Sequence, residues 1–167
     1  TQNGGEGLGR IRYRDLNEDG KIDEDDRTWI GSPHPDFMYG LNIELSYKNF
    51  DLSAFFYGVN GIDVNTYVVK SETDFWSIND VRSNKGTRLL DAWSPTNPDS
   101  NIPAITALNA NDEGRMSTYF VENGSFLKLR NLQLGYTLPR KISEKAYIEK
   151  CRIYVSGQNL FTIKSKN

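Results

Sequence analysis

Apolar and polar residues alternate most regularly between residues 37 and 47. Every second side chain is apolar, and glycine or polar side chains fill most positions between them; the alternating set is Phe37, Tyr39, Leu41, Ile43, Leu45 and Tyr47. A period of two is that of a β-strand, whereas a helix repeats about every 3.6 residues. Lys48 and Asn49 suit a two-residue turn, because asparagine tolerates the positive φ that such turns require. The alternation resumes at Phe50, so residues 37–59 are predicted to form a β-hairpin.

A second alternating stretch covers residues 119–138. Its parity changes at Arg130–Asn131, which predicts a β-bulge, an extra residue in one strand of a pair. A short helical turn is predicted for residues 141–150. Alternation returns from Cys151, so residues 119–163 are predicted to form a second hairpin.

Two further segments carry weaker signals. Arg10–Arg14 alternates charged and apolar side chains, as a half-buried strand does. Residues 60–118 show no sustained period, although a helix fits within residues 80–93. Loops of this length are usually functional or disordered. Residues 60–118 are predicted to be a long loop, which in an outer-membrane barrel would be extracellular.

The predicted connections differ in length according to the end of the sheet at which they lie. In an antiparallel meander, connections 15–36 and 60–118 share one end, and connections 48–49 and 139–150 share the other. Outer-membrane barrels separate long external loops from short periplasmic turns in this way. The pattern therefore predicts an all-β fold, an antiparallel meander that forms part of an incomplete transmembrane β-barrel. A soluble β-sandwich produces the same alternation and stays open as the alternative.

Charge and cysteine content exclude several classes of function. Among 167 residues, 20 basic and 22 acidic side chains give a net charge of −2, so a nucleic-acid surface is not expected. No apolar run approaches the roughly 18 residues of a transmembrane helix. The single cysteine, Cys151, excludes an internal disulfide and a cysteine-based zinc site, and it is far in sequence from the single histidine, His34. No residue pattern indicates an enzyme.

Residues 15–26 match the calcium-binding loop of the EF-hand. Calcium prefers about six to eight oxygen ligands. The predicted ligands are the side chains of Asp15, Asn17, Asp19, Asp23 and Asp26 and the backbone carbonyl of Lys21. Gly20 stands where the loop turns sharply, and Ile22 where an apolar side chain anchors it. The chemistry carried by this loop is therefore predicted to be calcium binding.

Two departures from the EF-hand limit this interpretation. The last ligand position holds Asp26 where glutamate is usual, and aspartate is shorter by one methylene. The segment before the loop is predicted to be a strand, so the helix pair that opens on calcium binding is missing. The calcium loop is therefore expected to be structural, not a sensor. An acidic turn without a metal is the alternative.

Six segments together resemble SusC-like TonB-dependent outer-membrane transporters, the RagA/SusC family. They follow the order of that family and cover most of the chain: Arg12–Ile22, Pro33–Gly40, Leu45–Ser53, Ala92–Pro98, Tyr119–Leu132 and Val155–Thr162. The resemblance implies a large barrel with an N-terminal plug, located in the outer membrane of a Gram-negative bacterium. Such proteins import oligosaccharides or sometimes peptides with energy delivered by TonB, and a SusD-like surface lipoprotein covers them.

The resemblance also sets what this chain is expected to be. Residues 1–167 lack a plug and have too few strands to close a barrel, so they are expected to be a C-terminal piece of the barrel wall in contact with membrane lipid. The alternative is a soluble, calcium-stabilised β-sandwich that binds glycans. The sequence does not identify the residues that contact a transported glycan or peptide.

Overall fold

The computed structural model describes residues 7–76, 78, 84–107, 109 and 111–165. The chain divides into two compact units. The first comprises Thr1–Gly31 and Asn65–Glu122, and the second comprises Ser32–Val64 and Asn123–Asn167. Among the described residues, every helix is too short or too polar to cross a membrane.

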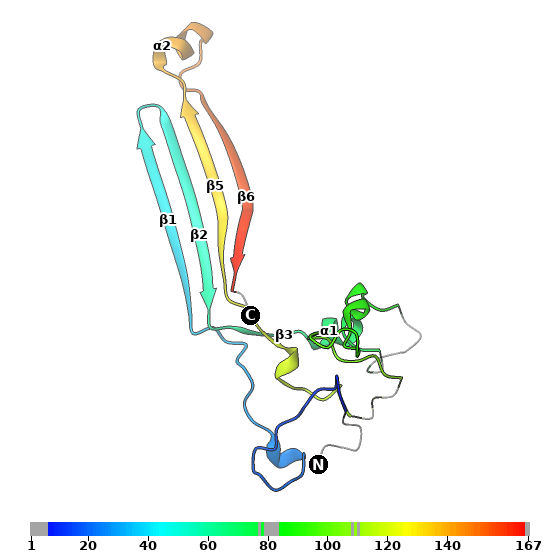
Figure 1. The fold of residues 1–167 in the computed structure, drawn as a ribbon. Helices are drawn as coiled ribbons and strands as arrows, with labels where there is room; N and C mark the ends of the chain where they lie inside the picture. Colours follow the sequence, from blue (N-terminus) through cyan, green and yellow to red (C-terminus); the bar gives the residue numbers. More distant parts are fainter. Residues whose placement is uncertain (1–6, 77, 79–83, 108, 110, 166–167) are drawn as a thin grey trace. The chain divides into compact units, whose positions relative to one another are not determined.

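A four-stranded antiparallel sheet forms most of the second unit (Figure 1). Its strands lie in the order β1 (Phe37–Tyr47), β2 (Phe50–Asn60), β5 (Phe126–Thr137) and β6 (Arg152–Lys164). Each strand pairs with the next one in this order, and the four strands do not close into a barrel. The fold is thus mostly antiparallel β-structure, as the alternation predicts.

One face of this sheet is apolar across all four strands. The register places Leu45 beside Leu52, Leu52 beside Leu134, and Leu134 beside Val155. Leu41 and Val155 are 55% and 68% exposed, so no other described part of the chain covers these side chains. We call this surface the apolar face. By register it also includes Phe37, Tyr39, Ile43, Tyr47, Phe50, Ala54, Phe56, Leu127, Leu129, Leu132, Tyr136, Ile153, Phe161 and Ile163.

The opposite face is largely polar, although it also carries Phe55, Tyr57, Val59 and Phe126 toward the end away from the short connections. An ion pair on this face bridges two strands which are not neighbours. Two of the guanidinium nitrogens of Arg152 on β6, Nε and Nη2, donate to the carboxylate of Asp51 on β2. Gly135 of β5 lies between them, and a Cβ at this position would collide with both side chains. Glycine is therefore required at residue 135 for the Asp51–Arg152 pair to cross β5.

A β-bulge keeps the apolar face continuous where the parity of the sequence changes. Phe56 pairs with Leu129, whereas Phe55 pairs with Asn131, so Arg130 is an extra residue in β5. This is the bulge predicted from the alternation, and it returns the following leucines to the apolar face. In the same region of β6, Asn159 has a φ of +52°.

The connections at one end of the sheet are short (Figure 1). Lys48 and Asn49 join β1 to β2, and the positive φ of +53° falls on Lys48, whereas the sequence analysis placed it on the asparagine. β5 and β6 are joined through helix α2 (Arg140–Ser143) and the 3-10 helix η4 (Glu144–Ala146). This agrees with the helical turn predicted for this connection.

The first unit contains short helices around an aromatic core. Its helices are η1 (Glu24–Asp26), α1 (Tyr67–Thr73), η2 (Thr87–Asp91) and η3 (Thr118–Phe120). Phe120 is fully buried, and its ring centroid lies 4.9 Å from that of Tyr67 and 5.7 Å from that of Phe75. Outside the four-stranded sheet, the chain also has a two-stranded sheet that pairs β3 (Asp63–Asn65) with β4 (Val121–Asn123), and its residues are divided between the two units.

The structure corrects three details of the sequence analysis. Arg10–Arg14 is not a strand, because the backbone N–H and carbonyl of Ile11 bond to the side chains of Glu113 and Asn111 and not to a neighbouring strand. The stretch from residue 119 opens with η3 and β4, and β5 starts only at residue 126. Helix α1 was not predicted; within residues 80–93 lies the 3-10 helix η2, while residues 80–83 fall outside the described part.

Replacing Gly58 with alanine is expected to destabilise the sheet by roughly 1–3 kcal/mol, the usual cost of overpacking. Gly58 pairs with Tyr39, whose ring lies where a Cβ of residue 58 would be. The measurement is the thermal unfolding of the intact protein. In a Tyr39→Ala background the same change should cost little, and equal losses in both backgrounds would contradict the predicted overlap.

Candidate functional site

The acidic loop of residues 15–26 is ordered by hydrogen bonds from its own backbone. Asp15 Oδ1 accepts the N–H of Glu18 at 2.7 Å, and Oδ2 accepts the N–H of Gly20 at 2.8 Å. Gly20 has a φ of +81°, which L side chains rarely adopt, and no atom crowds the place of a Cβ. Glycine is therefore favoured at residue 20 by its backbone conformation, not by a lack of room for a side chain.

The next two predicted ligands repeat this arrangement. Asn17 Oδ1 accepts the N–H of Asp19 at 3.1 Å, and Asp19 Oδ1 accepts the N–H of Lys21 at 2.8 Å. Short polar side chains that bond the backbone two residues ahead are typical of tight turns. The loop thus winds around the side-chain oxygens of Asp15, Asn17 and Asp19.

Asp26 joins the two ends of the loop. Its carboxylate accepts the N–H of Leu16 at 2.6 Å and the N–H of Asp23 at 2.9 Å. The bonds from the Asp23 and Leu16 N–H groups lower the pKa of Asp26, because they stabilise the charged form. Asp23 caps η1 by accepting the N–H of Asp25 at 3.0 Å. Asp26 is therefore ionised at neutral pH and holds the loop closed.

The donor set of this loop suits a hard cation that prefers oxygen. Its candidate ligands are carboxylates, the amide oxygen of Asn17 and the carbonyl of Lys21, with no sulfur or imidazole. A carboxylate oxygen that accepts one N–H keeps a second lone pair for a cation. In the described part of the chain, however, no three His, Cys, Asp or Glu side chains are grouped closely enough to hold a metal. Binding would therefore require these oxygens to draw closer together.

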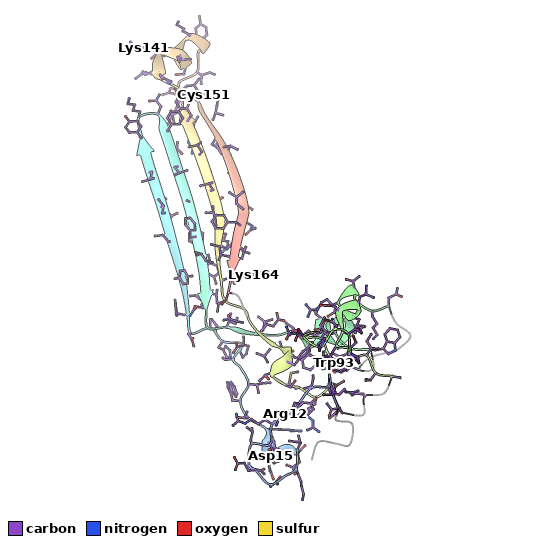
Figure 2. The ribbon with its side chains drawn as sticks, viewed as in Figure 1. Arg12, Asp15, Trp93, Lys141, Cys151 and Lys164 are labelled. Atoms are coloured by element: carbon purple, nitrogen blue, oxygen red, sulfur yellow. The ribbon has the colours of Figure 1, made fainter. Side chains whose placement is uncertain are left out.

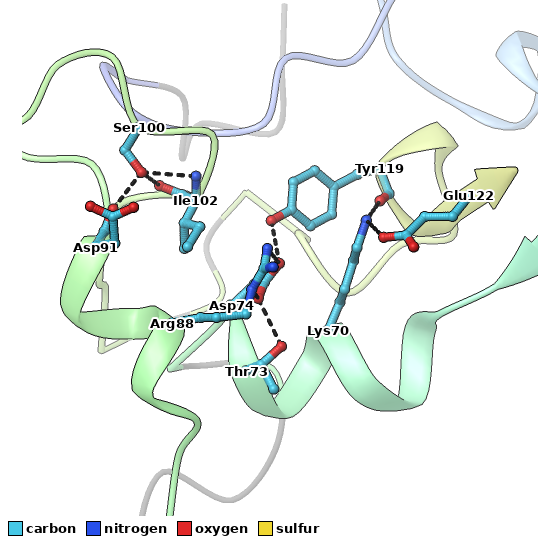
Figure 3. A network of polar contacts seen from close by, with 9 residues as sticks. All are labelled: Lys70, Thr73, Asp74, Arg88, Asp91, Ser100, Ile102, Tyr119 and Glu122. Carbon is cyan, nitrogen blue, oxygen red and sulfur yellow. Dashed lines mark hydrogen bonds and ion pairs between the residues drawn. The ribbon is translucent and has the colours of Figure 1, made fainter. Parts of the chain in front are cut away.

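A second cluster of polar side chains surrounds Asp74 in the first unit (Figure 3). Arg88 donates from Nε to Asp74 Oδ1 at 2.7 Å and from Nη2 to Oδ2 at 3.1 Å. The hydroxyl of Tyr119 donates to Oδ2 at 2.7 Å, and that of Thr73 donates to Oδ1 at 2.7 Å. The Asp74 side chain is fully buried, so these four bonds replace the water that it loses.

These bonds decide the protonation state of the cluster. Burial alone raises the pKa of Asp74, but the bonds from Arg88, Thr73 and Tyr119 outweigh it and the net pKa is lowered. Burial and the bond to Asp74 raise the pKa of the Tyr119 hydroxyl. Asp74 is thus a carboxylate and Tyr119 a neutral phenol at neutral pH. The cluster serves structure, because both oxygens of Asp74 already accept hydrogen bonds from other side chains.

Lys70 ties helix α1 to the segment that follows η3. Its ammonium lies 2.9 Å from Glu122 Oε1, donates to the carbonyl of Tyr119 at 2.6 Å and lies 4.7 Å from the centre of the Tyr119 ring (Figure 3). Thr66, just before α1, donates from its N–H to the carbonyl of Phe120 at 2.7 Å. Residues 66–70 and 118–122 are therefore held together despite their separation in sequence.

Arg10 forms a buried ion pair with a residue about 100 positions later in the sequence. Arg10 Nε lies 2.7 Å from Glu113 Oε1, and both side chains are at least nine-tenths buried. Tyr13 donates to the carbonyl of Asp112 at 2.8 Å, and burial raises its pKa to about 12. A pocket of about 410 Å³ in this unit is lined in part by Arg10, Arg12 and Trp93. Figure 2 marks Arg12 and Trp93, and also Asp15 in the acidic loop.

Comparison with known proteins matches nearly the whole chain to TonB-dependent receptors. It is 36% identical over 162 residues to TonB-dependent receptor P3 of Formosa agariphila, which covers 97% of this chain and 15% of that protein. It is 32% identical over 154 residues to TonB-dependent receptor SusC of Bacteroides thetaiotaomicron, which covers 90% of this chain and 14% of that protein. This chain thus spans about 15% of the length of the curated relatives it matches. No protein-family model matches it.

Solved structures of a related kind of transporter are also similar to this chain. The structure of the RagAB peptide transporter superposes with a TM-score of 0.67 and 26% identity, over 87% of this chain and 16% of that one. The RagAB peptide importer in its closed-closed state gives a TM-score of 0.62 and 25% identity. The likeness therefore extends to the arrangement of the chain in space.

Replacing Asp74 with asparagine is expected to destabilise the first unit locally by roughly 1–3 kcal/mol, the cost of leaving buried hydrogen bonds unmade. Because the pKa of Asp74 lies below its ordinary 3.8, its contribution is present above that pH and is lost as pH falls through the lower, folded value. The protection of the α1 amides, measured relative to their intrinsic exchange rates at each pH, should therefore fall below about pH 4 in the original protein.

The matched control is Asp99→Asn, an exposed carboxylate in the same unit. It should leave both the exchange rate and its pH dependence unchanged. An Asp74→Asn variant that retains the acid dependence of the original protein would contradict the role assigned to this carboxylate.

Proposed function

From the premise that this chain belongs to the family of SusC-like TonB-dependent receptors, we propose that it forms part of the wall of an outer-membrane β-barrel that imports nutrients. The observation that carries the proposal is the sheet with one apolar and one largely polar face. Barrel strands alternate in this way between lipid and lumen. The strands β1 and β2 have 11 residues each, near the roughly 9–11 that a tilted membrane strand needs.

Hydrogen bonding within the sheet supports a wall that continues on both sides. Backbone groups in lipid need partners, so membrane strands occur in closed barrels. Here β1 and β6 are the outermost strands of the sheet in the described part of the chain. In the intact barrel, further strands of the same protein would pair with these two edges. Exposed apolar side chains such as Leu41 argue against the alternative of a soluble sandwich, whose core would cover them.

The family suggests partners and ligands for the intact protein. We propose a SusD-like surface lipoprotein as the lid and TonB as the source of energy, with an oligosaccharide as the imported nutrient. Because the RagAB structures are those of a peptide transporter, a peptide is the second candidate. The chain itself has a structural role in the wall and is not proposed to be an enzyme.

We further propose that the acidic loop binds calcium. Asp15, Asn17 and Asp19 already point their oxygens into the turn, and Asp26 closes it. Calcium would bring these oxygens, those of Asp23 and the carbonyl of Lys21 closer together and neutralise their charge. At the cell surface, calcium at millimolar concentration would fill even a weak site.

The barrel-wall proposal is tested by two neighbouring arginine substitutions at the middle of β1. Leu41→Arg places a charge on the apolar face and should cost about 2–4 kcal/mol at the membrane midplane. Asn42→Arg places the same charge on the polar face and should be tolerated. The measurement is the amount of folded, heat-modifiable protein in the outer-membrane fraction.

Each result has a clear meaning. Leu41→Arg should sharply reduce the folded outer-membrane protein, and Asn42→Arg should leave it near the original amount. Equal yields of the two variants, or absence of the original protein from the outer membrane, would refute the assignment of the faces.

The calcium proposal is tested by titration calorimetry on the intact protein. The Asp15→Ala, Asp19→Ala double variant is expected to bind calcium at least about tenfold more weakly, because it loses two carboxylate ligands. Asp25→Asn is the matched control, since Asp25 is exposed and stands outside the proposed ligand set. Identical binding heats for the original protein and the double variant would rule out this site.

A further inference from the structure

Positive charge is concentrated at the end of the sheet that has the short connections. The turn at residues 48–49 and the connection at residues 138–151 contain five cations and two carboxylates, a net charge of +3. The whole chain has a net charge of −2, so all other residues together carry −5. The cations are Lys48, Arg140, Lys141, Lys145 and Lys150. We call this group the basic end.

Most of these charges are not neutralised by a neighbour. Arg140 pairs with Glu144 at 2.8 Å, an exposed pair. Within the described part of the chain, none of the four lysines lies within ion-pair distance of a carboxylate. Exposed lysines without a carboxylate partner are free to bind an external anion, because no internal ion pair has to be broken first.

A pocket lies between the two connections. It has a volume of about 790 Å³ and is lined in part by Lys48, Arg140, Glu149 and Lys150. Three of the five cations, Lys48, Arg140 and Lys150, therefore line one open site, from two connections that are about 90 residues apart in the sequence. Figure 2 marks Lys141 on α2, beyond the end of the strands.

The basic end adjoins the margin of the apolar face. The Lys48 ammonium lies 5.2 Å from the centre of the Tyr47 ring, and Tyr47 is 71% exposed. Phe50 and Tyr136 follow on the same face, with their ring centroids 4.7 Å apart. Aromatic side chains at the end of an apolar surface, followed by cations, are typical of the level of lipid headgroups.

We propose that the basic end binds the headgroup of an anionic phospholipid whose acyl chains lie along the apolar face. The phosphate would lie in the pocket near Lys48 and Lys150, and the aromatic margin would contact the start of the acyl chains. The inference rests on the barrel-wall proposal, which makes the apolar face the surface that meets lipid. It places this end of the sheet at the periplasmic leaflet, where the lipids are phospholipids.

The experiment measures lipid retention by the intact protein that carries this chain. The protein is placed in nanodiscs of phosphatidylcholine containing phosphatidylglycerol, and the lipids that stay bound after transfer to detergent are counted by native mass spectrometry. The variant replaces Lys48, Lys141, Lys145 and Lys150 with glutamine. Because each cation near the surface strengthens binding of anionic lipid, the variant should retain about tenfold less phosphatidylglycerol.

The control removes the same number of charges elsewhere. It replaces Arg14, Arg27, Arg130 and Lys164, all exposed, with glutamine and should retain phosphatidylglycerol as the original protein does. Added inorganic phosphate should not displace the lipid; displacement by phosphate would show that only a free anion is bound and would overturn the proposal. So would equal retention of phosphatidylcholine, or equal losses in the two variants.

Outer-membrane fractionation of the same proteins separates this inference from the barrel-wall proposal. A protein that is folded in the outer membrane but retains no anionic lipid would overturn the inference alone. A protein absent from the outer membrane would overturn both.

Discussion

The structure depends on one constraint: a single layer of sheet with an apolar surface that no described part of this chain covers. In water such a surface is unfavourable, since monomeric proteins rarely expose apolar patches of more than a few hundred Å². Apart from the bulge at Arg130 and the facing residues 159–160, β1, β2, β5 and β6 are paired along their ladders, so most of the cost lies with the side chains and the two edges. In the proposed barrel wall, hydrocarbon would remove the first cost, and adjoining strands would remove the second.

The first unit is stabilised in a different way. Its short helices surround a small aromatic core, and charged and polar contacts also hold the described segments of this unit together. The Asp74 carboxylate and the Arg10–Glu113 pair each join segments far apart in the sequence. Such contacts are specific because a buried charge without its partner is costly. They suit a part of the molecule whose surface meets water.

Sequence reasoning was most successful where local periodicity decides the structure. The hairpin of β1 and β2 and the bulge at Arg130 follow from alternation, because every second side chain must lie on one face. The strand predicted for Arg10–Arg14 was wrong, because the side chains that bond to the backbone of Ile11 come from about 100 residues away. Contacts between such distant residues leave no local pattern in the sequence. The Asp74 cluster was missed for the same reason, since Arg88 and Tyr119 show nothing in the sequence that links them to Asp74. The residues predicted to bind calcium are contiguous in the sequence, so their position in a single loop could be predicted without knowledge of distant contacts.

The ion pair that crosses β5 links three positions on three strands. Asp51 and Arg152 can meet only because residue 135 between them has no side chain. A larger residue at 135 would be compatible only with shorter or differently directed side chains at 51 and 152. These positions should therefore covary among relatives: where one changes, the other two are expected to change with it, although 101 residues separate the first from the last.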